Sequence, residues 1–108
     1  MMIHKKLIRD NIPSIIEKEG KKAEIIVLDD DTFLTALKEK LIEEAREVIH
    51  SDNKKDVLSE LADLKEVIDN LKEIYNISQA EINMAQGIKA IKNGKFEKHY
   101  YLVSVEEK

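Results

Sequence analysis

Two long stretches of helical periodicity, separated by only three residues, constrain the fold of this chain more than any other feature. Apolar residues recur every three or four positions over residues 32–50 and again over residues 54–75, a pattern typical of amphipathic helices. The intervening residues 51–53 (Ser-Asp-Asn) break the pattern as a turn, and so short a link forces the flanking helices to lie antiparallel. The sequence therefore predicts a helical hairpin.

A shorter helix is expected before the hairpin, over residues 12–19. Asp10 or Asn11 can cap its N-terminus, and Pro13 suits its first turn. Gly20 suits the left-handed position that often follows the last helical residue. These signals predict where the helix begins and ends.

The C-terminal part of the chain carries the remaining elements. A capping box at Ser78 and Glu81 opens a last helix, which ends near residue 93. Short extended segments are expected near 24–28 and 98–105, and their pairing as a two-stranded ribbon is a further hypothesis. Together these patterns predict an all-α fold in one domain, residues 1–108, with the hairpin as the core of a four-helix arrangement.

Composition excludes several classes of protein. A hydrophobic content of 43% in 108 residues is enough for the core of one small domain. A net charge of −4 argues against a nucleic-acid-binding protein, whose binding surface is normally basic. If the ligand is a polyphosphate, a divalent cation must bridge the two negative partners.

Cysteine and membrane signals are missing from the sequence. Without cysteine, neither disulfides nor thiolate metal sites can form. The apolar runs are too short for a membrane span, and the N-terminal residues lack the pattern of a signal peptide. We therefore expect a cytoplasmic protein that does not act on membranes.

Acidic residues line both halves of the predicted hairpin. Glu43, Glu44 and Glu47 lie directly beside the apolar stripe of the first long helix. On the second long helix, Glu60 falls within the apolar arc and Asp63 lies one step outside it. Residues three positions apart share a helix face, so the hairpin is expected to bring the two acidic groups opposite each other.

A carboxylate that points into an apolar seam needs compensation for its charge. Lys65 points away from Glu60, and Arg46 lies away from the acidic strip of its own helix. A divalent cation is the remaining compensation, and an all-oxygen set of ligands favours Mg²⁺ or Mn²⁺. The cluster has no histidine, which argues against zinc and against a di-iron centre. The alternative is an ordinary solvated helix face.

The acidic pattern resembles the signature of the all-α nucleoside triphosphate pyrophosphatase superfamily, which includes MazG, phosphoribosyl-ATP pyrophosphohydrolase and dimeric dUTPase types. That signature is E-E-x-x-E, a gap of a dozen or more residues, and E-x-x-D. Here it reads E-E-A-R-E over residues 43–47 and E-L-A-D over residues 60–63.

Both ends of the chain extend the resemblance to small stand-alone members of the superfamily. Residues 6–13 (K-L-I-R-D-N-I-P) are similar to their opening K-L-V-R-D-K-I-P, and residues 89–96 (K-A-I-K-N-G-K-F) to their closing K-x-x-x-R-G-G-F. The closing motif departs at Asn93, where arginine is usual, and at Lys95, where glycine is usual.

The resemblance implies Mg²⁺-dependent hydrolysis of a nucleoside triphosphate to a nucleoside monophosphate and pyrophosphate. It implies a house-cleaning role on modified or excess nucleotides and assembly as a homodimer or homotetramer. The implied metal ligands are Glu44, Glu47, Glu60 and Asp63, with Glu43 as a further ligand or a neighbour of the ligands.

Roles in the reaction follow as hypotheses. Glu43 or Glu47 would take the proton of the attacking water. The basic residues that would hold the phosphates are Lys6, Arg9, Lys89 and Lys92. The rival readings are a non-catalytic helical dimerisation module and a module that senses nucleotide or metal without turnover.

Overall fold

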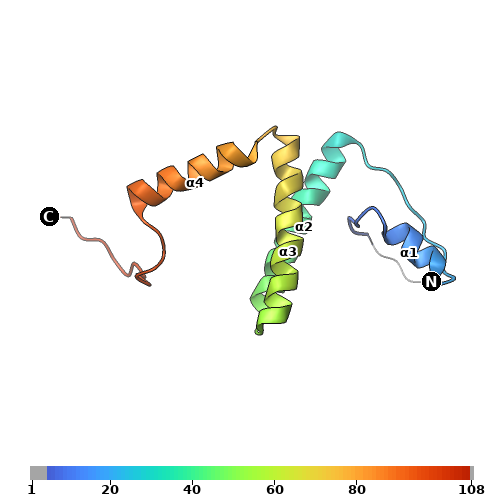
Figure 1. The fold of residues 1–108 in the computed structure, drawn as a ribbon, viewed down its shortest axis with the longest axis horizontal. Helices are drawn as coiled ribbons and strands as arrows, with labels where there is room; N and C mark the ends of the chain where they lie inside the picture. The colour runs from blue at the N-terminus through green and yellow to red at the C-terminus, as the bar shows by residue number, and fades with distance from the viewer. Residues whose placement is uncertain (1–4, 108) are drawn as a thin grey trace. The chain divides into compact units, whose positions relative to one another are not determined.

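A computed structural model describes residues 5–107 of the chain (Figure 1). The helices are α1 (Ile12–Lys18), α2 (Asp30–His50), α3 (Lys54–Ile74) and α4 (Gln79–Asn93). No strand is present among residues 5–107, so the protein is all-α, as the sequence predicts. The chain divides into two compact units, Met1–Asn76 and Ile77–Lys108, and each is described by itself.

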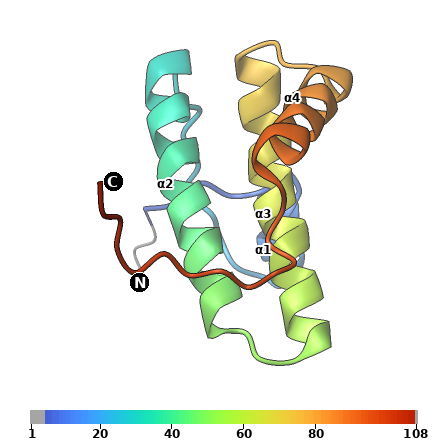
Figure 2. The ribbon, with the colours of Figure 1, turned by 90° about the vertical axis from the view of Figure 1, so that its left-hand side faces the viewer.

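The α2–α3 hairpin dominates the first unit. Each helix has 21 residues, and Figures 1 and 2 show the two lying antiparallel, side by side. The turn between them is held at both ends by side chains. Ser51 donates its hydroxyl to the Glu47 carbonyl at 2.7 Å, and the Asn53 side chain caps α3 by accepting the Asp56 amide at 2.9 Å. The predicted hairpin is confirmed.

The start of α2 lies two residues earlier than the periodicity predicts, at Asp30. The reason is the N-cap: the Asp29 carboxylate accepts the Thr32 amide at 2.8 Å. Hydrogen bonds from the Thr32 backbone and side chain lower the pKa of Asp29. Asp30 and Asp31 then occupy the first turn, where negative charge interacts favourably with the helix dipole.

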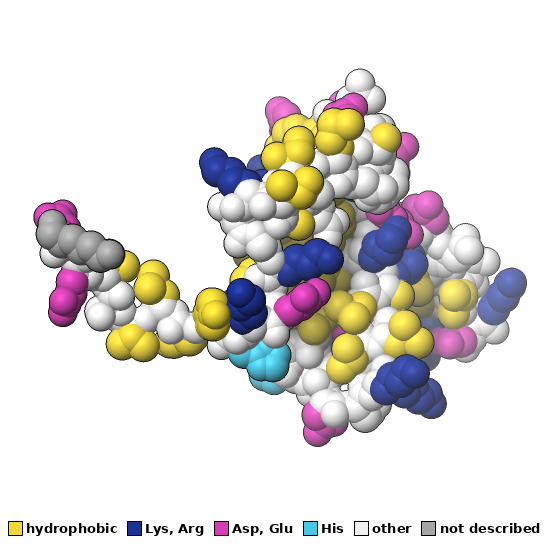
Figure 3. Space-filling view, turned by 60° about the vertical axis from the view of Figure 1, so that its left-hand side comes forward, with side chains coloured by type: hydrophobic (Ala, Val, Ile, Leu, Met, Phe, Trp, Pro, Cys, Tyr) yellow, Lys and Arg dark blue, Asp and Glu magenta, His cyan; other side chains and the backbone are white. Residues whose placement is uncertain are grey.

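The packed core of the described residues is small. Leu37 on α2 and Val67 on α3 are the buried apolar residues, with 2% and 6% of their surface exposed. Glu44 is buried beside them. The space-filling view in Figure 3 shows apolar side chains, in yellow, interspersed with charged ones on the face in view. Many large apolar side chains of the described residues are exposed, among them Ile26, Ile49 and Leu58.

The second unit consists of α4 and the segment that follows it. Ser78 accepts the Glu81 amide at 3.0 Å and so opens α4, at the capping box that the sequence predicts. Gly94 ends the helix with a φ of 81°, a left-handed conformation that glycine adopts without a steric penalty.

The expected ribbon between 24–28 and 98–105 is wrong for the part of the chain that the structure describes. Both segments are free of helix, but neither forms a strand. Val27 and Val103 are 95% and 89% exposed. A β-branched run favours an extended backbone, but a strand also needs a partner to accept and donate its hydrogen bonds.

Within residues 5–107, no helix is both long enough and apolar enough to cross a bilayer.

Candidate functional site

The α2–α3 hairpin brings three carboxylates together. One side-chain oxygen each of Glu44, Glu60 and Asp63 lies within 4.8 Å of the other two. Glu44 comes from the first half of the acidic pattern, on α2, and the other two come from the second half, on α3. A group of three carboxylate oxygens at this spacing could hold a metal ion.

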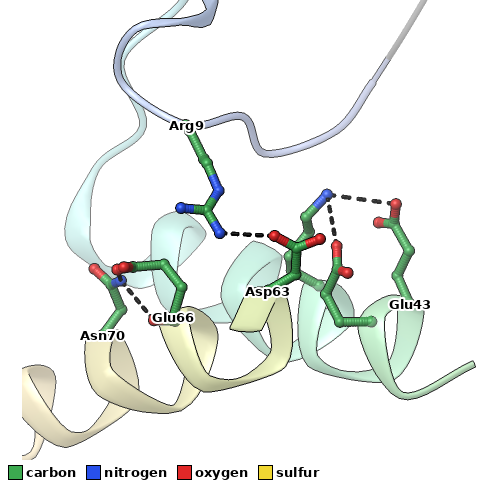
Figure 4. A network of polar contacts seen from close by, with 7 residues as sticks. Arg9, Glu43, Asp63, Glu66 and Asn70 are labelled. Carbon is green, nitrogen blue, oxygen red and sulfur yellow. Dashed lines mark hydrogen bonds and ion pairs between the residues drawn. The ribbon is translucent and has the colours of Figure 1, made fainter. Parts of the chain in front are cut away.

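Glu44 is the buried member of the group. It is only 7% exposed and is the one buried charged residue among those described. The Lys40 ammonium lies 3.4 Å from the nearer Glu44 oxygen and also 3.4 Å from Glu43, as Figure 4 shows by two dashed lines from one nitrogen. A lysine one turn earlier on the same helix therefore partly neutralises this carboxylate.

Asp63 is paired with a residue from outside the hairpin. The Arg9 guanidinium donates a hydrogen bond to Asp63 Oδ1 at 2.7 Å, across 54 positions of sequence (Figure 4). Arg9 and Asp63 side chains are 58% and 39% exposed, so solvent screens this pair. The bond ties the segment before α1 to the acidic side of α3.

Glu60 lies in a different electrostatic environment. Among residues 5–107 it has no basic group within ion-pair distance. Its pKa is raised, first by desolvation and then by the negative charges of Asp63, Glu47 and Glu44. It is thus the carboxylate of the group whose charge the described residues compensate least.

Glu43 and Glu47 lie outside the group of three oxygen atoms. Glu43 is exposed and shares the Lys40 ammonium with Glu44. Glu47 is also exposed, but its charge contributes to the raised pKa of Glu60. The charge of Glu47 therefore acts on Glu60, whereas Glu43 shares a lysine with Glu44.

A cleft of about 720 Å³ opens beside the carboxylates, a size suited to a small molecule. It is lined by residues of both charge signs, with apolar side chains between them. The charged lining residues are Lys6, Arg9, Asp10, Lys40, Glu44, Asp63 and Glu66. Two of the predicted phosphate-binding residues thus share a cleft with two of the predicted metal ligands.

The other two predicted phosphate-binding residues belong to the second unit. Lys89 and Lys92 lie exposed on α4, and Lys92 is in its last turn. Asn93, the first departure from the family motif, is the last residue of this helix. Both lysines therefore occupy the C-terminal half of α4.

Lys40 lies among the acids of this site, but the sequence predictions give it no role and name only Lys65 and Arg46 as possible basic partners. The signal was present, because lysine and glutamate four positions apart share a helix face. By contrast, no local spacing could have paired Arg9 with Asp63.

Comparisons with protein-family models, with curated proteins and with solved structures found no match.

Proposed function

We propose that this protein is a Mg²⁺-dependent nucleoside triphosphate pyrophosphohydrolase that cleaves the bond between the α- and β-phosphates. The observation that carries the proposal is the convergence of Glu44, Glu60 and Asp63 at one point of the hairpin. These residues come from the two halves of an acidic pattern that resembles the pyrophosphatase signature. The resemblance alone suggests modified or excess nucleotides as substrates.

The donor set fits a magnesium or manganese ion. All three groups offer carboxylate oxygens, which are the ligands that these hard cations prefer. Desolvation and then the neighbouring acids raise the pKa of Glu60, so a nearby dication would offset the cost of its ionisation. When bound, the metal would act as a Lewis acid on the α-phosphoryl group and lower the pKa of a water molecule.

Proton transfer is assigned to Glu47. Of the two candidates, Glu47 is the one whose charge contributes to the raised pKa of Glu60. In the proposed step the oxygen of water bonds to the α-phosphorus, and a proton passes to the Glu47 carboxylate. The bond from the α-phosphorus to the bridging oxygen breaks, and pyrophosphate leaves.

The leaving pyrophosphate gains negative charge, which basic residues can stabilise. Lys6 and Arg9 line the same cleft as Glu44 and Asp63, so we assign them to the phosphates. We retain Lys89 and Lys92 as phosphate-binding residues on the family resemblance alone.

A second copy of the chain is the partner we propose, giving a homodimer or a homotetramer. The hairpin leaves large apolar side chains exposed on both of its helices, and these would be covered in a dimer. They are Ile42 and Ile49 on α2 and Leu58 and Leu61 on α3, which are 47% to 76% exposed.

Pyrophosphate release from a panel of standard and modified nucleoside triphosphates, with and without Mg²⁺, tests the proposed reaction. We expect release only with Mg²⁺, and a turnover lower by about 100-fold or more in Glu60→Gln. Loss of a group that orients a metal ligand already lowers activity by about 10-fold to 100-fold, and loss of the ligand itself should cost at least as much. Glu73→Gln is the matched control, since Glu73 is an exposed acid on the same helix.

Wild-type turnover in Glu60→Gln would contradict the assignment of the metal site. Binding of nucleotide by the wild-type protein without release of pyrophosphate would instead indicate a sensing module. A protein that neither binds nor hydrolyses nucleotide would indicate a helical dimerisation module.

A further inference from the structure

We propose that Lys40 is an additional phosphate-binding residue, held by Glu43 and Glu44 until a divalent cation takes over Glu44. The assignment rests on the proposed function, because it requires both a metal ion and a phosphate ligand at this site. It gives one side chain two successive partners, a carboxylate and then a phosphate.

The first observation is the position of Lys40. It lines the cleft together with Lys6 and Arg9, and its side chain is 22% exposed. A lysine has a flexible stem and an ammonium group with three donors, so it can change partner without moving its backbone. Lys40 is therefore within the cleft in which the phosphates are proposed to bind.

The second observation is the length of its contacts. Lys40 lies 3.4 Å from both Glu43 and Glu44, whereas charge-assisted hydrogen bonds between ammonium and carboxylate are normally about 2.7–2.9 Å long. The Arg9–Asp63 bond, at 2.7 Å, is of the short kind. Lys40 is thus attracted to two carboxylates without being fixed closely by either.

The third observation is the burial of Glu44, which is 7% exposed. An ionised carboxylate so far from water needs a cation nearby, and Lys40 is the cation that the metal-free protein supplies. A dication bound to the same carboxylate would compete with the ammonium for it. The attraction between the Lys40 ammonium and Glu44 would then weaken, but the lysine would still line the cleft.

The charges of the site support the exchange. The carboxylates of Glu43, Glu44, Glu47, Glu60 and Asp63 outnumber the basic groups of Lys40 and Arg9 by three. A bound dication would cut this excess to one, so the site would repel an anion much less after the metal has bound. Lys40 would be the basic group released at that moment.

Calorimetric titrations of the full-length protein test the exchange with two probes, Mn²⁺ alone and inorganic pyrophosphate at saturating Mn²⁺. In Lys40→Met we expect Mn²⁺ to bind about twofold to fivefold more tightly, because the ammonium that competes with Mn²⁺ for Glu44 is removed. We expect pyrophosphate to bind about tenfold more weakly, because a hydrogen bond between charged groups is lost. Lys40→Gln, a second neutral variant, should show the same two shifts if Lys40→Met folds poorly.

Lys38→Met is the matched control, because it removes the same charge from an exposed position on the same helix. Unchanged affinities for both probes in Lys40→Met would overturn the proposal, and so would equal shifts in Lys38→Met, which would indicate a general field effect. If the wild-type protein takes up no Mn²⁺, the exchange and the proposed function both fail. If it binds Mn²⁺ and the Lys40 variants match it, only the exchange fails.

Discussion

The α2 side and the α3 side of the acidic cluster compensate their charge in different ways. On α2, Glu44 is buried and has Lys40 from its own helix at 3.4 Å. On α3, Glu60 has no basic partner among the described residues, and its pKa is raised by desolvation and then by acids on both helices. Glu44 thus has a cation from its own helix and Asp63 has Arg9 from the segment before α1, whereas Glu60 has neither among the described residues.

Weakening the packing between α2 and α3 should have the largest effect on stability. Leu37 is 2% exposed and packs in the small core of the hairpin, so Leu37→Ala should lower the free energy of unfolding by about 2–5 kcal/mol. Urea denaturation measures this change. Ile26→Ala is the control, since Ile26 is 77% exposed and its truncation should change the free energy by less than about 0.5 kcal/mol. Equal losses in the two variants would show that the core lies elsewhere.

Neutralising Glu60 on α3 and Glu44 on α2 in turn should change the stability of the protein in different ways. The raised pKa of Glu60 means that its ionisation is disfavoured more in the folded than in the unfolded protein. Its contribution to stability is therefore most favourable below the ordinary glutamate pKa of 4.5 and falls as the pH rises through the raised pKa. In EDTA, Glu60→Gln should remove this pH-dependent loss of stability. The variant should therefore melt at a higher temperature than the wild-type protein near pH 7.

Glu44→Gln should not raise the melting temperature as Glu60→Gln does. It removes a charge that Lys40 already compensates, so the metal-free protein should gain no stability from it. Thermal melting of both variants in EDTA, across the acid range and at neutral pH, measures the contrast. A rise in melting temperature in Glu44→Gln equal to that in Glu60→Gln would remove the distinction between the two sides.

The smallest effect should come from the ion pair that joins α3 to the N-terminal segment. Arg9 and Asp63 are both partly exposed, so Arg9→Gln should cost less than about 1 kcal/mol of global stability. We expect a local effect instead, with faster amide hydrogen exchange around residues 5–11. Unchanged exchange in this segment would show that the bond does not hold it.

Local signals were enough to predict most of the fold. The helices begin and end within two residues of their expected limits, because Pro13, Asn53, Ser78 and Gly94 mark those limits chemically. The meeting of Glu44 with Glu60 and Asp63 follows from helical spacing and from a link too short for any arrangement other than a hairpin.

Contacts between distant segments could not be predicted in the same way. The Arg9–Asp63 bond joins residues 54 positions apart, and no periodicity relates them. The ribbon failed for a related reason, since residues 24–28 and 98–105 are suited to extended backbone but carry no information about a partner. The spacing of Lys40 and Glu44 was visible, but it is also common on solvated helices.

The central claim is that Glu44, Glu60 and Asp63 together hold a divalent cation. Electron paramagnetic resonance of free Mn²⁺, titrated with protein in the presence and absence of nucleotide, measures this directly. The expected result is a loss of the free Mn²⁺ signal with the wild-type protein and with Glu73→Gln, but not with Glu60→Gln or Asp63→Asn. An undiminished free signal with the wild-type protein, even with nucleotide present, or equal uptake by all four proteins, would contradict the claim.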